Sequence, residues 1–353
     1  MKLTIGDRVW ERALLTVGVF KLIALVLFFA SFSTIGQVPA QAQSDASCSG
    51  KNLADHFQQT DPTKFEEIIA EADKVLNGNS LLWKIEKQGF ATSWMMGTMH
   101  LSHPDVSGLT DRTKQVIANV DTVVIETLDV LDKQAMVKAM QSLAHLTMLP
   151  ADEKLTDLIA ADLRDELEAE TSTRGMPMQL VDRLQPWLVA TSVALPVCEL
   201  ARKQSGEPVL DVAIANYAKE NGKALKGLET VKEQFEAMAS LPREFHISAL
   251  EQTLASGSNV LDMLTTMKDL FLEEKISMVF PLMQASSPEI YTGDDATKFQ
   301  EALIEKRNLT MAERSLSILG NGASLIAVGA LHIPGDTGLV ELLRSKGFTV
   351  TAQ

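Results

Sequence analysis

Two histidines and two glutamates in this sequence each follow a short run of apolar residues. Each histidine ends a Gly-x-x-His tetrad, and each glutamate closes a segment that reads as a strand. Neutral imidazole and carboxylate together suit Zn, Mn, Fe or Co. The sequence therefore predicts a divalent-metal site, provided that the fold brings these side chains together. The four predicted ligands are His100, His332, Glu126 and Glu229.

A metal held by such groups lowers the pKa of a bound water toward neutrality and polarises a carbonyl group, which is the chemistry of a hydrolase. Without a metal, the same histidines and glutamates could act as general base and general acid. Gly97 and Gly329 begin the two tetrads. Glycine there would let the backbone turn sharply at the strand end and approach a ligand closely. We therefore predict that both glycines contribute to substrate binding.

None of these signals is specific by itself. A single histidine at the end of a strand is more often a hydrogen-bonded structural residue than a ligand. A single glutamate there is often a helix N-cap partner or a solvated strand end. The hypothesis depends on co-occurrence, because four side chains of metal-binding type all follow apolar strands.

The segments before these residues have the patterns of strands in an α/β fold. A β-hairpin around Gln88-Gly89 is predicted for 81–96, and its second strand runs into His100. The run that ends at Glu126 is continuously apolar, as expected of a strand buried on both faces. Open α/β sheets bind ligands at the carboxyl ends of their strands. If the strands are neighbours, both imidazoles and both carboxylates reach one edge. Further strands are predicted at 121–126, 223–229, 324–329 and 348–351, with a helix at 338–346.

A long stretch in the middle of the chain has no strand pattern. Between about 131 and 221 the apolar residues recur at helical spacing. We expect a large helical insertion there. The predicted fold is α/β, with a central mixed sheet, flanking helices and this insertion, in a single domain over 43–353.

The first 42 residues have the features of an export signal. Basic residues precede an apolar stretch at 22–32, and small residues at Ala40 and Ala42 suit a signal peptidase. We predict cleavage after Ala42, no stable membrane span afterwards, and a periplasmic or secreted protein. An uncleaved anchor is the alternative, although this stretch is short for a bilayer span.

The charge balance bears on the kind of partner. The chain has 46 acidic and 32 basic residues and a formal net charge of -14. No run of Lys or Arg is long enough to follow a phosphate backbone, so we expect no nucleic-acid binding. A peptide or another small molecule is the expected substrate.

The chain contains two cysteines, Cys48 and Cys198. In an oxidising compartment they predict a disulfide that ties the N-terminal segment to the helical middle. A catalytic cysteine is the alternative, but neither residue stands in a strand-to-helix turn beside a histidine.

Taken in order, several segments resemble the motifs of TraB/GumN proteins, and the resemblance covers nearly the whole chain after the signal. Met99 stands where many relatives have Ile or Val before the first motif histidine. The two cysteine segments are also similar to the paired cysteine segments of exported members. The matching segments are 82–85, 97–100, 124–126, 227–231 with Gln234, Arg307-Asn308, and 328–332 with Pro334-Gly335.

The resemblance implies membership of a superfamily with the TIKI metalloproteases and, more distantly, the erythromycin esterases and the haem-iron protein ChaN. It implies paired Gly-x-x-His motifs and Mn- or Co-dependent activity. Arg307 matches the arginine of the family's Arg-Asn pair. Its guanidinium could clamp a substrate carboxylate or stabilise an oxyanion, and a helix-surface salt bridge is the alternative. We assign Asn308 to substrate binding.

Two hypotheses follow. The first is an exported metal-dependent hydrolase that acts on peptides, with Mn, Co or Zn bound by His100, His332 and one or both of Glu126 and Glu229. The remaining glutamate would be the general base. The second is a non-catalytic binding or regulatory protein that sequesters a peptide or a metal cofactor. A shared fold does not decide between them.

Overall fold

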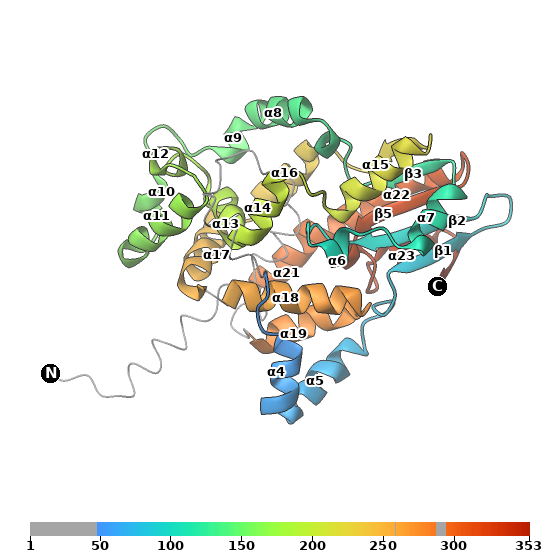
Figure 1. Ribbon diagram of the computed structural model, residues 1–353, viewed down its shortest axis with the longest axis horizontal. Helices are drawn as coiled ribbons and strands as arrows, with labels where there is room; N and C mark the ends of the chain where they lie inside the picture. Colours follow the sequence, from blue (N-terminus) through green and yellow to red (C-terminus); the bar gives the residue numbers. More distant parts are fainter. Residues whose placement is uncertain (1–47, 258, 287–293) are drawn as a thin grey trace.

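The computed structural model describes residues 48–257, 259–286 and 294–353, and the predicted signal segment 1–42 lies outside them. Within these ranges six strands form one mixed sheet in the order β4-β3-β5-β2-β1-β6 (Figure 1). The predicted α/β class with a mixed sheet is therefore confirmed. The strands are β1 (Leu82–Glu86), β2 (Ser93–Thr98), β3 (Thr122–Ile125), β4 (Ala224–Gly227), β5 (Ser324–Gly329) and β6 (Thr349–Ala352).

Four neighbouring strands of this sheet run in the same direction. β3 pairs in parallel with both β4 and β5, and β5 pairs in parallel with β2. The predicted hairpin is confirmed, since β1 pairs antiparallel with β2, and β1 also pairs antiparallel with β6. The carboxyl ends of β4, β3, β5 and β2 therefore lie at one edge, in that order.

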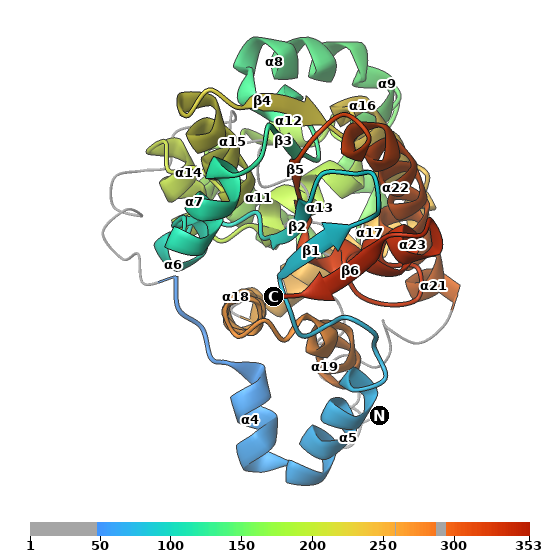
Figure 2. The same ribbon diagram turned by 90° about the vertical axis from the view of Figure 1, so that its right-hand side faces the viewer.

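Helices cover both faces of the sheet (Figure 2). Alternate residues of a strand point to opposite faces. Val123 and Ile125 accordingly belong to one apolar core and Val124 to another. The first core includes side chains of α7 (Asp111–Ala118) and α15 (Leu210–Glu220). The second includes side chains of α22 (Lys306–Leu319) and α23 (Leu339–Ser345).

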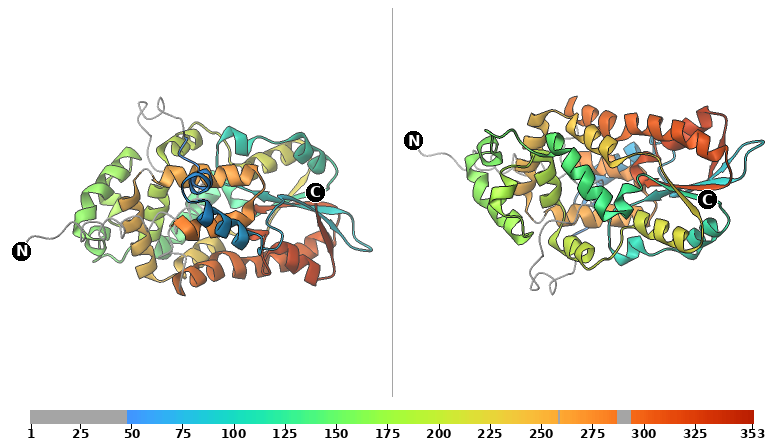
Figure 3. Two further views of the ribbon diagram at one scale, coloured as in Figure 1. Left: turned by 90° about the horizontal axis from the view of Figure 1, so that it is seen from below. Right: turned by 90° about the horizontal axis from the view of Figure 1, so that it is seen from above.

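A separate helical lobe lies at the other end of the molecule from the sheet (Figure 3). Its own apolar core contains Trp187, Phe235 and Leu250. The helical segment between β3 and β4 is divided, because α15 packs on the sheet and not in this lobe. The elements of the lobe are α8 (Lys133–Ser142), α9 (Ala144–Thr147), α10 (Leu155–Leu158), η2 (Ala161–Leu163), α11 (Arg164–Thr173), α12 (Met178–Val181), α13 (Pro186–Ala194), α14 (Val197–Gln204), α16 (Val231–Ala239) and α17 (Arg243–Ser256).

The remaining elements lie outside the lobe. The N-terminal helices pack against α18 and α19 at the lower end of Figure 1. A π-helical turn, η4, immediately precedes α22. These elements are α4 (Leu53–Thr60), α5 (Pro62–Ala72), α6 (Pro104–Ser107), η1 (Asp129–Leu131), α18 (Asn259–Leu272), η3 (Ile276–Met278), α19 (Val279–Ser286), α21 (Asp294–Gln300), η4 (Glu301–Glu305) and η5 (Ala330–His332).

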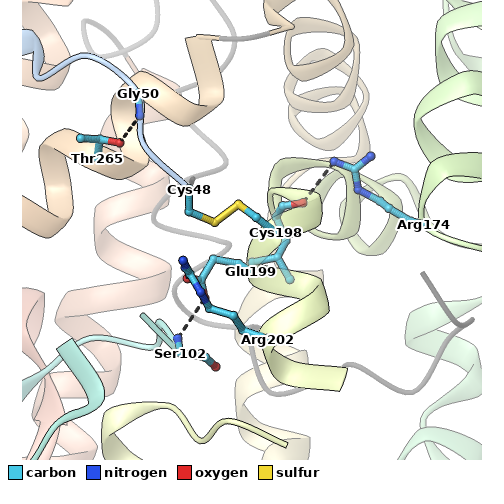
Figure 4. Close-up of a disulfide and its surroundings, with 9 residues drawn as sticks. Cys48, Gly50, Ser102, Arg174, Cys198, Glu199, Arg202 and Thr265 are labelled. Atoms are coloured by element: carbon cyan, nitrogen blue, oxygen red, sulfur yellow. Dashed lines mark hydrogen bonds and ion pairs between the residues drawn. A yellow bond between two sulfur atoms is a disulfide. The ribbon is translucent and has the colours of Figure 1, made fainter. Parts of the chain in front are cut away.

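The predicted disulfide is confirmed. Cys48 is bonded to Cys198 at the start of α14, and the two Cα atoms are 5.8 Å apart. The segment that follows Cys48 lies along α18, where the Gly50 amide donates to Thr265 at 2.7 Å (Figure 4). A Cβ at Gly50 would come within 2.4 Å of the Asp262 backbone, so only glycine allows this approach. The disulfide and this segment together connect α14 to α18.

The next residue of α14, Glu199, supports the loop that carries His100. Its side chain is buried, and its Oε2 accepts the Ser102 amide at 2.9 Å (Figure 4). Arg202 pairs with the other carboxylate oxygen at 2.6 Å. The disulfide is thus adjacent in sequence to a contact that holds the backbone two residues after His100.

No helix in the described ranges has both the length and the apolar character needed to cross a bilayer. The disulfide fits an oxidising compartment.

The disulfide closes a loop between residues 150 positions apart, so we expect a large effect on stability. Replacing both cysteines by serine should lower the free energy of unfolding by about 2–5 kcal/mol, because the unfolded chain gains freedom. Urea denaturation of the oxidised protein and of the variant measures this. Reductant should destabilise the natural chain and leave the double-serine variant unchanged; equal midpoints for both proteins would contradict the prediction.

Candidate functional site

The parallel strands place the predicted residues in a row along one edge of the sheet. In the order β4, β3, β5 and β2, the strands are followed by Glu229, Glu126, His332 and His100. Three of these side chains line one cavity, and Glu229 lies behind Arg307. We call the polar side of this cavity the polar floor; it consists of Thr98, His100, Glu126, Arg307 and His332.

One guanidinium is shared by the two glutamates. Arg307 Nη2 lies 2.8 Å from Glu126 Oε2 and 2.6 Å from Glu229 Oε2. Its Nε donates to both oxygens of Glu229, at 3.0 and 3.1 Å. Its Nη1 donates to the Leu303 carbonyl at 3.1 Å. All three charged side chains are at most 7% exposed. Arg307 therefore already uses the donors that were predicted to clamp a substrate carboxylate.

The two carboxylates differ in their acidity. Burial alone would raise the pKa of Glu126, but Arg307, the two histidines and the Gly329 amide outweigh it and hold the pKa at about 2. For Glu229 burial prevails over Arg307, and the pKa is raised. One positive charge serves two acids, and it favours ionisation of the acid that also faces His332. Glu126 is therefore the permanently charged member of the pair.

His332 is held in one tautomer by Asn308. The Asn308 amide nitrogen donates to the Thr337 carbonyl at 2.8 Å, so its oxygen faces His332 Nδ1, which is 2.6 Å away. An amide oxygen only accepts, so Nδ1 must carry the proton and Nε2 a lone pair. Burial and the nearby Arg307 lower the pKa of His332 to about 3, which keeps the ring neutral. Asn308 is fully buried, and both ends of its amide are used in this way.

The free side of His332 faces a second acceptor. Its Nε2 lies 3.8 Å from Glu126 Oε1, and this oxygen also accepts the Gly329 amide at 2.7 Å. Two lone-pair acceptors at this separation can share a proton donor or a cation. A zinc ion lies about 2.0–2.2 Å from such ligands, so one ion could contact both atoms.

His100 is supported from the opposite helical layer. Its Nδ1 lies 2.8 Å from Asp211 Oδ2 in the first turn of α15. The other oxygen of Asp211 accepts the Thr98 hydroxyl at 2.7 Å. Burial would lower the pKa of His100, but Asp211 outweighs burial and the pKa is raised. A carboxylate behind a histidine is a common arrangement around metal sites, because it fixes the ring and increases its basicity.

Gly97 and Gly329 allow close packing and do not form a left-handed turn. Neither has a positive φ. A Cβ on Gly329 would lie 3.1 Å from Glu126 Oε1. A Cβ on Gly97 would come within 2.8 Å of the Leu81 side chain and 3.2 Å of the Ala330 Cα. Gly329 therefore makes room for the Glu126 carboxylate at the end of β5, and Gly97 makes room for the turn that carries His332.

A π-helical turn lies beside the charged cluster. It spans Glu301–Glu305, directly before Lys306–Leu319, the helix of Arg307 and Asn308. The Leu303 carbonyl of this turn accepts from Arg307, and the Leu303 side chain lines the cavity. Such turns are rare and occur often at functional sites.

The metal prediction requires three or more ligands. In the part of the chain that the structure describes, no group of three His, Cys, Asp or Glu side chains is assembled to hold a metal ion. Glu229 would have to leave Arg307 in order to bind one. The donor chemistry of His100, His332 and Glu126 nevertheless fits a divalent cation, since both histidines have an acceptor on Nδ1 and leave Nε2 for a ligand.

Two supporting residues were not identified from the sequence. Asp211 lies in the predicted helical insertion, 113 positions from its partner Thr98, and its pattern is that of an ordinary acidic residue in the first turn of a helix. Gln234 donates to Glu126 at 3.2 Å and to Glu229 at 3.4 Å. It belongs to the motif that resembles the family, but its spacing alone predicts no role for it.

Comparison with known proteins agrees with this architecture. Residues 81–352 match the model of the TraB/PrgY/gumN family. The chain belongs to this family. The strand ends, both Gly-x-x-His tetrads, both glutamates and Arg307 all lie within the matched range.

Several relatives are named metalloproteases. Metalloprotease TIKI2 of Danio rerio is 25% identical over 349 residues, which cover 84% of this chain and 66% of the relative. Metalloprotease TIKI1 of Homo sapiens is 25% identical and covers 77% and 61%. The uncharacterized protein YbaP of Shigella flexneri is 23% identical and covers 76% and 95%. The chain thus spans about two thirds of the length of these TIKI proteins. No solved structure matches the chain.

The shared guanidinium makes Arg307 a predicted weak point of the fold. Replacing Arg307 by alanine should lower the free energy of unfolding by about 3–5 kcal/mol, because it leaves buried carboxylates without a counter-charge. Urea denaturation measures the loss. Lys306→Ala on the same helix is the matched control, since Lys306 is an exposed cation and its loss should cost at most about 1 kcal/mol. Equal losses in the two variants would argue against the role of the cluster.

Proposed function

We propose that this TraB/PrgY/gumN family member is a metal-dependent hydrolase of peptides. The observation that carries the proposal is the pair of facing acceptors, His332 Nε2 and Glu126 Oε1, which lie 3.8 Å apart on two buried side chains that line one cavity. Such a pair is suited to hold a cation or to orient a water molecule. The TIKI relatives, which are named metalloproteases, support peptide hydrolysis as the reaction class.

His100 and His332 would hold the cation through Nε2, with Glu126 as the third ligand. A bound divalent cation would supply Lewis acidity, which makes a water nucleophilic near neutral pH and polarises a carbonyl group. Arg307 would keep Glu126 ionised, and Gly329 would fix the direction of its carboxylate through the 2.7 Å hydrogen bond. Glu229, whose pKa is raised, would exchange a proton with the reacting groups only after it leaves Arg307. Glu126 would be a ligand, and its lowered pKa makes it a weak base, so we assign the proton-accepting role to Glu229.

The Arg-Asn pair would position other groups. Arg307 contacts both carboxylates, and Asn308 contacts His332. The structural contacts thus favour positioning roles over the substrate-binding roles expected from the sequence. Mn, Co and Zn are the candidate metals. The disulfide supports an oxidising compartment, so we propose a periplasmic or secreted protein.

A binding protein is the second candidate. Two observations favour it. Arg307 donates hydrogen bonds to both Glu126 and Glu229, and in the described ranges no three His, Cys, Asp or Glu side chains are grouped as metal ligands. Such a protein would sequester a peptide or a metal cofactor without turnover.

Hydrolysis of a mixed peptide library separates the two candidates. The chelator-stripped protein should cleave peptides only after Mn, Co or Zn is added, and His100→Ala and His332→Ala should each reduce cleavage at least about 100-fold, because each removes a proposed ligand. Mass spectrometry of the products measures cleavage. The control is His103→Ala, which removes a histidine of the same loop that caps α6. Tight peptide binding without products would favour the binding protein.

The residues behind the histidines should set metal affinity. Asn308→Ala and Asp211→Asn should each weaken Co²⁺ binding about 10–100-fold, because the imidazoles lose their fixed orientation. Isothermal titration with Co²⁺ measures this without reference to activity. Asn321→Ala, on the exposed segment after α22, should bind Co²⁺ like the unchanged protein. Unaltered affinity in both test variants would remove the histidines from the metal site.

A further inference from the structure

The cavity has a second, apolar side that the proposed chemistry does not use. We call this the apolar wall. Its side chains come from α18, η3, α19, α21 and η4, and each is between 3% and 6% exposed. The residues of the apolar wall are Met267, Phe271, Ile276, Val279, Phe299 and Leu303.

The apolar wall is supported by two different cores. Met267, Phe271, Ile276 and Val279 belong to a core that also packs on the sheet. Phe299 and Leu303 belong to the core of the helical lobe. The cavity therefore lies where these two cores meet, and each side of the wall is fixed by its own packing. Close-packed supports of this kind hold a pocket open with a defined shape.

We propose that the apolar wall is a specificity pocket for an aliphatic side chain, of leucine or methionine size, next to the bond that is cleaved. The proposal rests on the proposed function, because it names the substrate class of the same site. The cavity volume of about 60 Å³ exceeds by several times the roughly 10–15 Å³ that one water needs. A side chain of a few heavy atoms therefore fits.

The apolar wall disfavours substrate side chains that carry a charge. The apolar wall carries no ionisable group. On the polar floor, the positive charge of Arg307 is already shared between Glu126 and Glu229. The apolar wall offers an acidic side chain no counter-charge, so such a side chain would lose its hydration there without compensation. A lysine or arginine side chain would have to leave water for an apolar surface, which is costly without a partner.

The relative position of the two sides gives the pocket a catalytic consequence. Both sides belong to one cavity, so an anchored side chain would place the neighbouring amide beside His332 and Glu126. Positioning of this kind lowers the barrier by reducing the freedom lost in the reaction. Each methylene that fits a pocket of this type changes kcat/KM by about 10-fold or more.

The test starts from a peptide of the mixed library that the protein cleaves. The residue beside the cleaved bond is then replaced by leucine, alanine, aspartate or phenylalanine. The leucine peptide should exceed the alanine peptide at least about 10-fold in kcat/KM and the aspartate peptide at least about 100-fold. Val279→Phe, which fills the pocket, should reduce the leucine-to-alanine ratio at least about 10-fold. Leu303→Ala, which enlarges it, should raise the ratio of phenylalanine to leucine peptides.

The control is Leu264→Ala, a buried residue of α18 that does not line the cavity. It should leave every ratio unchanged. Loss of folded protein reduces cleavage of all peptides equally, so these ratios remain meaningful in a destabilised variant. The pocket would be overturned by an active enzyme that has the same kcat/KM for all peptides. It would also be overturned if the ratios of kcat/KM between peptides were unchanged in both pocket variants.

A binding measurement separates failure of the pocket from failure of the proposed function. Fluorescein-labelled heptapeptides with Leu, Ala or Asp at the central position are titrated into His100→Ala protein, and anisotropy is recorded. Selective binding of the leucine peptide that Val279→Phe abolishes supports the pocket even if no metal gives cleavage. If the three peptides bind equally, the pocket is rejected whatever the outcome for hydrolysis.

Discussion

The site depends on one guanidinium that compensates two buried carboxylates. Arg307 comes from α22, whereas Glu126 follows β3 and Glu229 follows β4. Because a buried charge without a partner costs several kcal/mol, these three elements are constrained to meet in one arrangement. The constraint leaves Glu126 ionised and turns its second oxygen toward Gly329 and His332. The geometry of this edge of the sheet is thus fixed by the ion pairs of Arg307.

Each imidazole is supported by a different layer of the fold. His332 is fixed by Asn308, one residue after Arg307 on α22. His100 is fixed by Asp211 of α15, which covers the other face of the sheet. The sheet edge places the rings, and the two helical layers determine which nitrogen of each ring faces the cavity. Neither layer would be sufficient alone.

This division explains how much could be predicted from the sequence. The sheet and the row of His100, Glu126, Glu229 and His332 were predictable, because parallel strands align their carboxyl ends. The strand before Glu229 differs from the expectation, since β4 is a largely exposed edge strand and not a buried one. Asp211 was not predictable, since its partner is distant in the sequence and first-turn acids are common in helices. The occupation of Arg307 by both glutamates also required the structure, because no local pattern distinguishes a buried guanidinium from an exposed one.

The apolar side of the cavity was not predictable for a different reason. Its residues have the helical spacing of ordinary core residues, and only the meeting of two cores turns some of them toward a cavity. The glycines of the two tetrads show a related limit. The sequence indicated that they allow a close approach, but it attributed this to a sharp turn. The structure shows that the missing Cβ makes room for Glu126 and for the turn after β5.

The π-helical turn at Glu301–Glu305 has a consequence for how this site can vary. A regular helix rotates by about 100° per residue, and the wide turn contains one residue more than an α-helical turn. Deleting one residue there would yield a regular helix, but it would rotate Phe299 by about 100° relative to Arg307. Arg307 would keep its contacts with the two glutamates and Asn308 its contact with His332, whereas the bond from Arg307 to the Leu303 carbonyl would change and a different side chain would face the cavity. The turn therefore determines how Phe299 of the apolar wall is rotated relative to Arg307. A change of length at this point would alter the apolar wall and leave the ion pairs of Arg307 in place.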